Sequence, residues 1–272
     1  MKTRTRILSV ALAAGALMVL PMASRATIIG SPHDFGTNSW AASDVCQVCH
    51  VPHASLGSAN APLWNHVLPG QTYVTYSSPT FIANGGAAAP QPDGPSLACL
   101  SCHDGTLAIN QVVSVPYGGT GVTNISQGGA VLLSNPSDNV TWQQGGNDLS
   151  HNHPISFVYG SSLAAADGTL NNPATYTIGS APQYPQNATF TNNAAAMVPP
   201  IPASGWTGIS LSGKPLTVLL WNGPQGTEME CTSCHDPHKM MGSSASSGIM
   251  IKISGKDANG RGDLICRNCH LK

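Results

Sequence analysis

Eight cysteines form four pairs with the same spacing, and a histidine follows each pair directly. The cysteines are Cys46, Cys49, Cys99, Cys102, Cys231, Cys234, Cys266 and Cys269. The histidines are His50, His103, His235 and His270. C-x-x-C-H is the attachment signature of c-type haem, because two thiols at this spacing can form thioethers on one porphyrin edge. The adjacent histidine then binds the iron axially. The pattern predicts four covalently bound haems, with these histidines as proximal ligands.

Three other uses of paired cysteines were weighed against haem attachment. Zinc knuckles, a redox-active dithiol and a set of disulfides in an exported chain all use cysteine pairs. None of them accounts for a histidine immediately after every pair, or for the lack of a leftover cysteine. Haem attachment is therefore the favoured interpretation.

Six further histidines are candidates for the second axial position on the irons. His53 and His238 each come three residues after a motif histidine, beyond a proline that bends the chain away from it. They are therefore expected to serve a neighbouring haem. We predict distal ligation by His33, His53, His153 and His238, with His66 and His151 in reserve.

This supply of histidines favours electron transfer over catalysis. A six-coordinate haem iron has no position for a substrate, so the sequence predicts an electron carrier and no catalytic residue. The alternative is a multihaem reductase of nitrite, hydroxylamine or a sulfur oxyanion, which needs an open iron and a positive approach for the anion. No Lys or Arg occurs from Ala26 to Gly213, which disfavours that alternative.

The amino terminus reads as an export signal. Lys2, Arg4 and Arg6 precede an apolar run over residues 7–20, and small residues follow up to Ala26. This order predicts a signal peptide over residues 1–26. The alternative is a retained anchor, as in a tetrahaem quinol dehydrogenase, but the run is shorter than the about 20 residues of a spanning helix. We expect an extracellular or cell-surface protein, otherwise a periplasmic one, without a membrane span after cleavage.

Composition and charge narrow the possible partners. Charged residues make up 8% of the chain, against about 25% in an average soluble domain. After signal cleavage, seven basic and twelve acidic residues leave a net charge of −5, which disfavours nucleic acid as a partner. All seven basic residues lie from Lys214 onward, where only five acidic residues occur. This asymmetry is compatible with head-to-tail self-association, which forms open filaments when it does not close.

The motifs divide the mature chain into three regions. Residues 27–110 and 231–272 each carry two motifs, and residues 111–230 form an insert rich in Gly, Asn, Ser and Thr that contributes His153. Strands are predicted where short apolar runs stand between turn signals: Gln111–Val115, Ala130–Leu133, Val140–Gln143, Ile155–Tyr159 and Leu216–Trp221. The predicted fold class is mostly irregular, with short helices at the haem motifs, a few short β-strands and a core supplied largely by haem.

The segments CQVCHVPH, CTSCHDPH, SPHDF and NHPISF resemble those of multihaem cytochromes with doubled C-x-x-C-H motifs. Four motifs, an export signal, low charge and the long insert make the chain most similar to the extracellular tetrahaem cytochromes of metal-reducing bacteria, some of which polymerise into conductive filaments. The resemblance implies bis-histidine haems that pass electrons to redox partner proteins or an extracellular acceptor. In filament formers a neighbouring protomer can donate one axial histidine, and His33 is the candidate here. The alternative is a soluble periplasmic shuttle.

Overall fold

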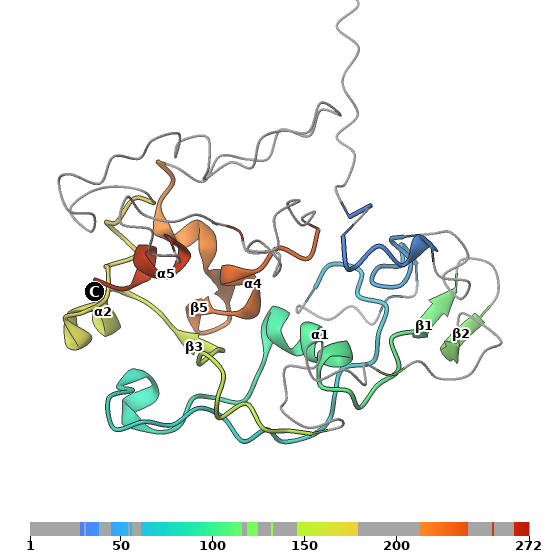
Figure 1. Ribbon diagram of the computed structural model, residues 1–272, viewed down its shortest axis with the longest axis horizontal. Helices are drawn as coiled ribbons and strands as arrows, with labels where there is room; N and C mark the ends of the chain where they lie inside the picture. The colour runs from blue at the N-terminus through green and yellow to red at the C-terminus, as the bar shows by residue number, and fades with distance from the viewer. Residues whose placement is uncertain are drawn as a thin grey trace, which may run out of the picture.

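The computed structural model describes residues 28–29, 31–37, 45–53, 55, 61–115, 119–124, 132, 146–178, 213–238, 252 and 264–271 (Figure 1). The predicted signal peptide and the strand predicted at Val140–Gln143 lie outside these residues, and only Leu132 of the strand predicted at Ala130–Leu133 is included. Within the described part, no helix is both long and apolar enough to cross a bilayer.

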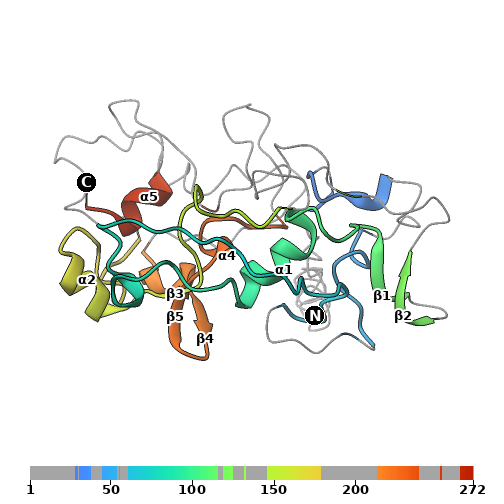
Figure 2. The ribbon, with the colours of Figure 1, turned by 90° about the horizontal axis from the view of Figure 1, so that it is seen from below.

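Short helices are spread along the chain. They are the 3-10 helices η1 (Phe35–Thr37), η2 (Ala83–Gly86) and η3 (Leu216–Leu219), and the α-helices α1 (Gly94–His103), α2 (Ser161–Asp167), α4 (Cys231–Cys234) and α5 (Leu264–Cys269). Figures 1 and 2 both place α2 and α5 toward one end of the molecule, with α4 and α1 between them and the β1–β2 pair. Helices α1, α4 and α5 contain the cysteines of the second, third and fourth C-x-x-C-H motifs, whereas Cys46 and Cys49 of the first motif lie in a turn.

The strands form two small antiparallel sheets. In the first, β1 (Gln111–Val115) pairs with β2 (Gly119–Asn124). In the second, the strand order is β3 (Phe157–Val158), β5 (Gly226–Met229), β4 (Trp221–Gly223), so that β4 and β5 make a hairpin. The strand predicted at Gln111–Val115 is confirmed with the same bounds, whereas only two residues of the one predicted at Ile155–Tyr159 are in a strand.

The strand predicted at Leu216–Trp221 is wrong over most of its length. Leu216–Leu219 is a 3-10 helix, and only Trp221 belongs to a strand. Pro215 precedes the helix, and the Val218 amide donates back to the Pro215 carbonyl at 3.1 Å. Leu216 and Leu219 are both buried, because a three-residue spacing brings them to one face of a 3-10 helix. An apolar run this short does not distinguish a strand from a helix by its pattern.

Helix α2 was not predicted. It has only seven residues, and it ends where Gly168 adopts a left-handed backbone with φ of 67°. Glycine adopts this conformation without a Cβ clash, so Gly168 is a usual helix end. The short run SSLAAAD carries too few large apolar residues to show a helical period.

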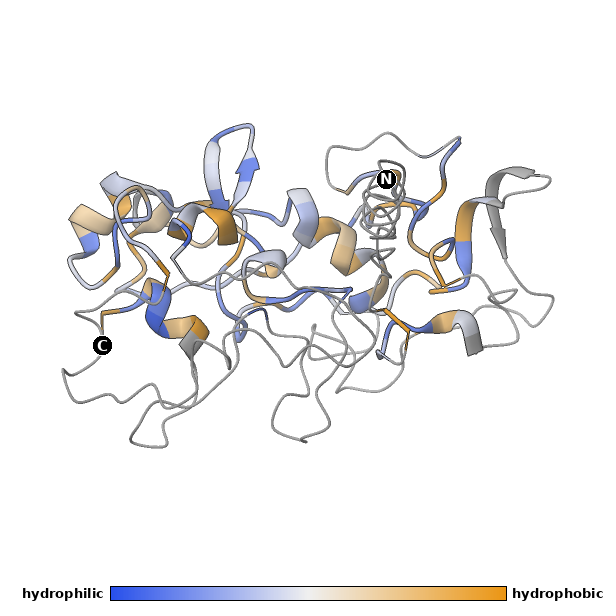
Figure 3. Cartoon of the chain, turned by 90° about the horizontal axis from the view of Figure 1, so that it is seen from above, coloured by the Kyte–Doolittle hydropathy of each residue, from blue (hydrophilic) through white to orange (hydrophobic). Residues whose placement is uncertain are grey.

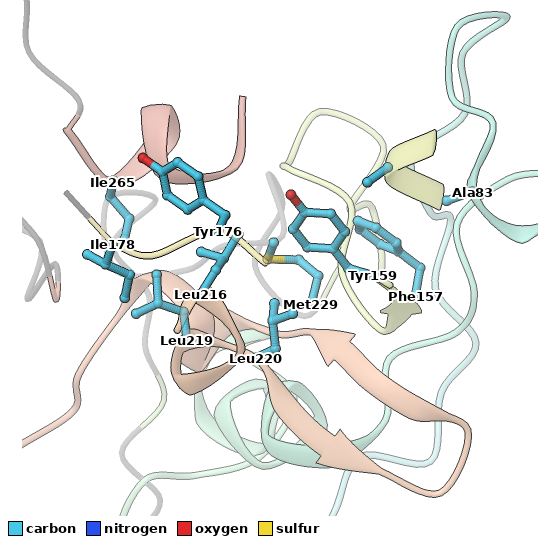
Figure 4. Close-up of a cluster of buried hydrophobic side chains, with 11 residues drawn as sticks. Ala83, Phe157, Tyr159, Tyr176, Ile178, Leu216, Leu219, Leu220, Met229 and Ile265 are labelled. Carbon is cyan, nitrogen blue, oxygen red and sulfur yellow. The ribbon is translucent and has the colours of Figure 1, made fainter. Parts of the chain in front are cut away.

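The largest buried cluster is built from side chains of all three predicted regions (Figure 4). Its members are Ala83, Phe157, Tyr159, Ala164, Tyr176, Ile178, Leu216, Leu219, Leu220, Met229 and Ile265. Two smaller clusters lie elsewhere, one centred on Val48 and Ile109 and the other on Tyr73, Leu100 and Leu149. A side-chain core therefore exists in one part of the molecule, and the contribution of haem to the core stays a prediction.

Candidate haem-binding sites

Each C-x-x-C-H motif contains one helical or helix-like turn. In three motifs the histidine amide donates to the carbonyl of the first cysteine at 2.8–2.9 Å: the pairs are His50–Cys46, His235–Cys231 and His270–Cys266. The remaining motif ends α1. Side chains three and four positions apart on a helix share one face. The two sulfurs and the imidazole of a motif are therefore on one side of the turn, as covalent haem attachment requires.

The first and second motifs lie next to each other. Burial raises the pKa of Cys49 and of Cys102 to about 12, and the nearby Cys49 thiol adds to the increase at Cys102. Both cysteines pack against the cluster of Val48 and Ile109. The two motifs thus share one apolar environment.

The second and third motifs also touch. The Cys99 thiol donates a hydrogen bond to the Cys231 sulfur, which raises the pKa of Cys99 and lowers that of Cys231. The Cys231 amide donates to Ser96 Oγ at 2.9 Å, which ties the start of α4 to α1. This junction connects the two pairs of motifs.

The third and fourth motifs are neighbours as well. Burial raises the pKa of Cys234 to about 11, with Cys266 as the next contributor. Burial likewise raises the pKa of Cys269 to about 12, with Cys234 next. The four motifs accordingly follow one another in space in the order in which they occur in the sequence.

Three motif histidines each face a second histidine ring. The ring centres are 5.9 Å apart for His33 and His103, 6.0 Å for His50 and His238, and 6.3 Å for His153 and His270. A metal-bound imidazole nitrogen lies about 2.0–2.1 Å from a zinc ion, and a similar bond on each side of an iron puts two ring centres about 6 Å apart. The three spacings suit histidines that bind one iron from opposite faces.

Hydrogen bonds fix which ring nitrogen is available in three of these histidines. The Nδ1 atom bonds a proline carbonyl in each: His50 to Pro62 at 2.6 Å, His33 to Pro237 at 3.2 Å and His153 to Pro154 at 2.8 Å. A carbonyl only accepts, so the proton is on Nδ1. The lone pair of Nε2 is then free for a metal, and such outer hydrogen bonds usually orient metal-binding histidines.

Burial affects the pKa of His33, and a carboxylate lies near the His238 ring. Burial, followed by the neighbouring His103, lowers the pKa of His33, which favours the neutral imidazole that binds metals. The Nδ1 atom of His238 lies 3.9 Å from the Asp236 carboxylate. The interactions of Asp236 and of the Pro62, Pro154 and Pro237 carbonyls were not predicted, although the proximity of Asp236 to His238 in the sequence could have suggested the first.

Asp104, which directly follows the second motif, holds the end of α1 in place. Its buried carboxylate accepts from Tyr73 Oη and Gln71 Nε2, both at 2.7 Å, and from the Thr106 amide at 2.8 Å. These bonds fix the residue next to His103. We assign Asp104 a positioning role for that histidine.

The other candidate histidines are placed differently. His53 is exposed, and it has no described ring contact or hydrogen bond. His66 is buried, and burial lowers its pKa to about 4 although hydrogen bonds to the Val48 and Gln111 backbone oppose this. His151 is exposed, and His235 is partly buried. The structure brings His33, His153 and His238 to motif histidines and leaves His53 at the surface.

The competing uses of the cysteines find little support in this geometry. No disulfide joins any of the eight cysteines in the structure. Among the described residues, no group of three or more Cys and His ligand atoms gathers around one point, as a zinc knuckle requires. Redox-active dithiols have a lowered cysteine pKa. Burial raises the pKa for Cys49, Cys102, Cys234 and Cys269, whereas the hydrogen bond from Cys99 lowers it for Cys231.

No protein-family model matches this chain, and a search of curated proteins returns no match. The similarity to multihaem cytochromes therefore rests on the motifs and the geometry described above.

Proposed function

We propose that the chain transfers electrons through four covalently bound c-type haems, outside the cytoplasm. The observation that carries the proposal is the set of three histidine ring pairs spaced 5.9–6.3 Å apart, each containing a motif histidine. Sequence positions far apart, such as His50 and His238, meet at this spacing without any short-range reason to do so. A shared metal explains it.

Haem supplies the one-electron iron chemistry when it is bound. The chain's residues do the rest. The cysteine pairs would anchor the porphyrins, the motif histidines would bind the irons, and His33, His153 and His238 would supply a second histidine ligand to three of them. Proline carbonyls and Asp236 orient the imidazoles through Nδ1, and the contacts between successive motifs keep neighbouring haems close enough for electrons to pass along the row.

An electron carrier is favoured over a reductase because three of the four motif histidines face a second imidazole. If each pair held one iron, those three irons would have no position for nitrite or a similar substrate. Residues 26–213, which include the first two motifs, also contain no Lys or Arg that could attract an anion.

The distal ligands are tested by His238→Ala in the haem-loaded protein. We expect one of the four haems to lose its second imidazole, to acquire a high-spin ferric absorption band and to bind carbon monoxide when reduced. Asp148→Asn, which changes a partly buried carboxylate outside the haem motifs, is the control and should leave the spectrum low-spin. An unchanged low-spin spectrum in His238→Ala would contradict the assignment.

The filament-forming variant of the proposal needs a histidine that reaches another protomer. His33 was the candidate, but it faces His103 of its own chain at 5.9 Å. His53 suits the role better, because it is exposed and close to a motif. Electron microscopy of the haem-loaded protein should show filaments for the natural chain and none for His53→Ala, with four haems retained in both. Monomers in both would support the soluble shuttle instead.

A further inference from the structure

Three acidic side chains meet inside the protein between α1 and the β4–β5 hairpin. Asp93 directly precedes α1, Glu228 lies in β5, and Glu230 directly precedes α4. One ligand oxygen from each lies within 4.8 Å of the other two. Glu228 and Glu230 are each only 1% exposed, although the hairpin is hydrophilic along most of its length (Figure 3). Buried carboxyl groups are rare unless something compensates their charge.

Hydrogen bonds satisfy only part of this cluster. Glu230 Oε2 accepts from the Ser96 amide at 3.2 Å and from Ser156 Oγ at 3.3 Å. Glu228 Oε1 accepts from the Gln225 amide at 3.1 Å. Three oxygens are buried without any hydrogen-bond partner: Asp93 Oδ1, Glu228 Oε2 and Glu230 Oε1. An unpaired buried carboxylate oxygen is costly, so a ligand for these atoms is expected.

No described Lys or Arg offers a cation to this cluster. Among the described residues, no Lys or Arg side chain pairs with any of the three carboxyl groups. Burial is the main cause that raises the pKa of Glu230 to about 8, and it also raises the pKa of Glu228. The Asp93 carboxyl adds to both increases. Either protons or a bound cation must therefore relieve the repulsion.

Two glycines and a tryptophan enclose the cluster. A Cβ atom on Gly223 would lie 2.5 Å from both Glu228 Oε1 and the Trp221 ring, and one on Gly94 would lie 2.6 Å from the same ring. The Trp221 indole thus packs directly on the backbone at Gly94 and Gly223. Asp93 occupies the N-cap position of α1 without making a capping hydrogen bond. Its carboxylate is therefore available to the cluster.

We propose that Asp93, Glu228 and Glu230 bind a divalent cation, and that this cation is calcium. Carboxylate oxygens are the ligands of hard cations, and calcium accepts irregular arrangements of six to eight oxygens, whereas magnesium demands a near-ideal octahedron. Carboxylates from three separate segments form such an irregular set. The bound ion links the start of α1 to β5 and α4, and so stabilises the junction between the second and third motifs. This site does not depend on the proposed haem function.

The test uses the haem-loaded full chain, treated with EGTA and then titrated with calcium chloride. We expect one calcium ion per chain by elemental analysis, and a higher unfolding temperature with calcium than with EGTA. Glu228→Gln keeps the side-chain shape and should weaken calcium binding in calorimetry by at least about tenfold, because one ligand charge is lost. Asp148→Asn changes a partly buried carboxylate outside the cluster, and this variant should bind calcium as the natural chain does.

A natural chain that binds no calcium, and whose unfolding temperature is the same in calcium and in EGTA, would overturn the proposal. That result would mean that protons, not a cation, neutralise the cluster. If Glu228→Gln does not fold, the unfolding temperatures of the natural chain in calcium and in EGTA still test the proposal. Asp93→Asn is then the second variant for the binding measurement. Wild-type calcium affinity in a folded Glu228→Gln would also overturn the proposal.

Discussion

The region around the first two haem motifs and the region around the last two pack their buried apolar side chains in different ways. An eleven-residue cluster packs against Cys234 and Cys269 of the last two motifs. Around the first two motifs, two small clusters contain only two and three buried residues, and Cys49 and Cys102 pack against one of them. Under the proposed function, the amino-terminal haem region (residues 45–115) would therefore depend more on bound haem than the carboxy-terminal haem region (residues 157–178, 213–238 and 264–271).

The contrast explains how a chain poor in large apolar residues can still fold. Leu, Ile, Val and Phe make up about one residue in five, a level where a protein-only core is hard to build. Most buried apolar side chains of the carboxy-terminal haem region join one large cluster, whereas those of the amino-terminal haem region form small groups. In the amino-terminal haem region, flat porphyrin surfaces take the place of side chains under our proposal.

The largest expected effect is the loss of structure in the amino-terminal haem region when haem is absent. Haem-free protein, made without the maturation system, should lose amide protection over residues 45–115 by more than about tenfold and keep it near Tyr159 and Leu216. Hydrogen exchange followed by mass spectrometry measures this. Equal amide protection of both regions in the haem-free chain would contradict the difference proposed between them.

The next largest expected effect is the loss of unfolding free energy when one buried leucine of each region is replaced by alanine. Leu216→Ala removes a fully buried side chain from the large cluster, and should cost about 2–5 kcal/mol in unfolding free energy with or without haem. Leu100→Ala in α1 should cost a similar amount only in the haem-loaded protein, because its surroundings order only then. Val218→Ala, exposed in the same 3-10 helix as Leu216, is the control. Urea titrations of both forms test the difference.

A smaller effect concerns pH in the amino-terminal haem region. Burial lowers the pKa of His66 from 6.5 to about 4, so the unfolded chain binds more protons between these values. Unfolding free energy should therefore fall as the pH drops from about 6.5 to 4, by up to about 3 kcal/mol. His66→Gln should remove most of this slope. A slope that persists in His66→Gln would assign it to other groups.

A second pH effect has the opposite sign and belongs to the carboxy-terminal haem region. Burial raises the pKa of Glu230 from 4.5 to about 8, so the folded chain holds more protons between these values. In EGTA, unfolding free energy should fall as the pH rises from about 4.5 to 8. Calcium should reduce the fall at the alkaline end, and Glu230→Gln should abolish it in haem-loaded protein. Denaturation curves at several pH values test this prediction. An unfolding free energy that rises with pH in EGTA would contradict it.

Features set by a short stretch of sequence could be predicted, whereas contacts between segments far apart in the sequence could not. The regular cysteine–histidine spacing marked the motifs, and the β-branched run QVVSV marked β1 with its observed bounds. The pairing of His50 with His238, and of His33 with His103, depends on how the chain folds back across more than 60 residues. The distal candidates were chosen from the residues next to prolines, and the structure brings three of the four to motif histidines.

The acidic cluster of Asp93, Glu228 and Glu230 is the clearest example of a contact that could not be predicted from the sequence. Asp93 and Glu228 lie 135 residues apart in the sequence, and neither is part of a recognisable ion-binding loop. Only the packing of the β4–β5 hairpin against α1 brings them together. The helix η3 was missed for a related reason, because its leucines are buried by tertiary contacts that an apolar run does not specify.

The most direct test of the account is an intact-mass and spin-state measurement on the exported protein. We expect a mass equal to that of residues 27–272 with four haems attached. We also expect ferric electron paramagnetic resonance signals of low-spin, bis-histidine iron. A chain that carries no covalent haem, or whose irons are high-spin and turn over nitrite, would contradict the account.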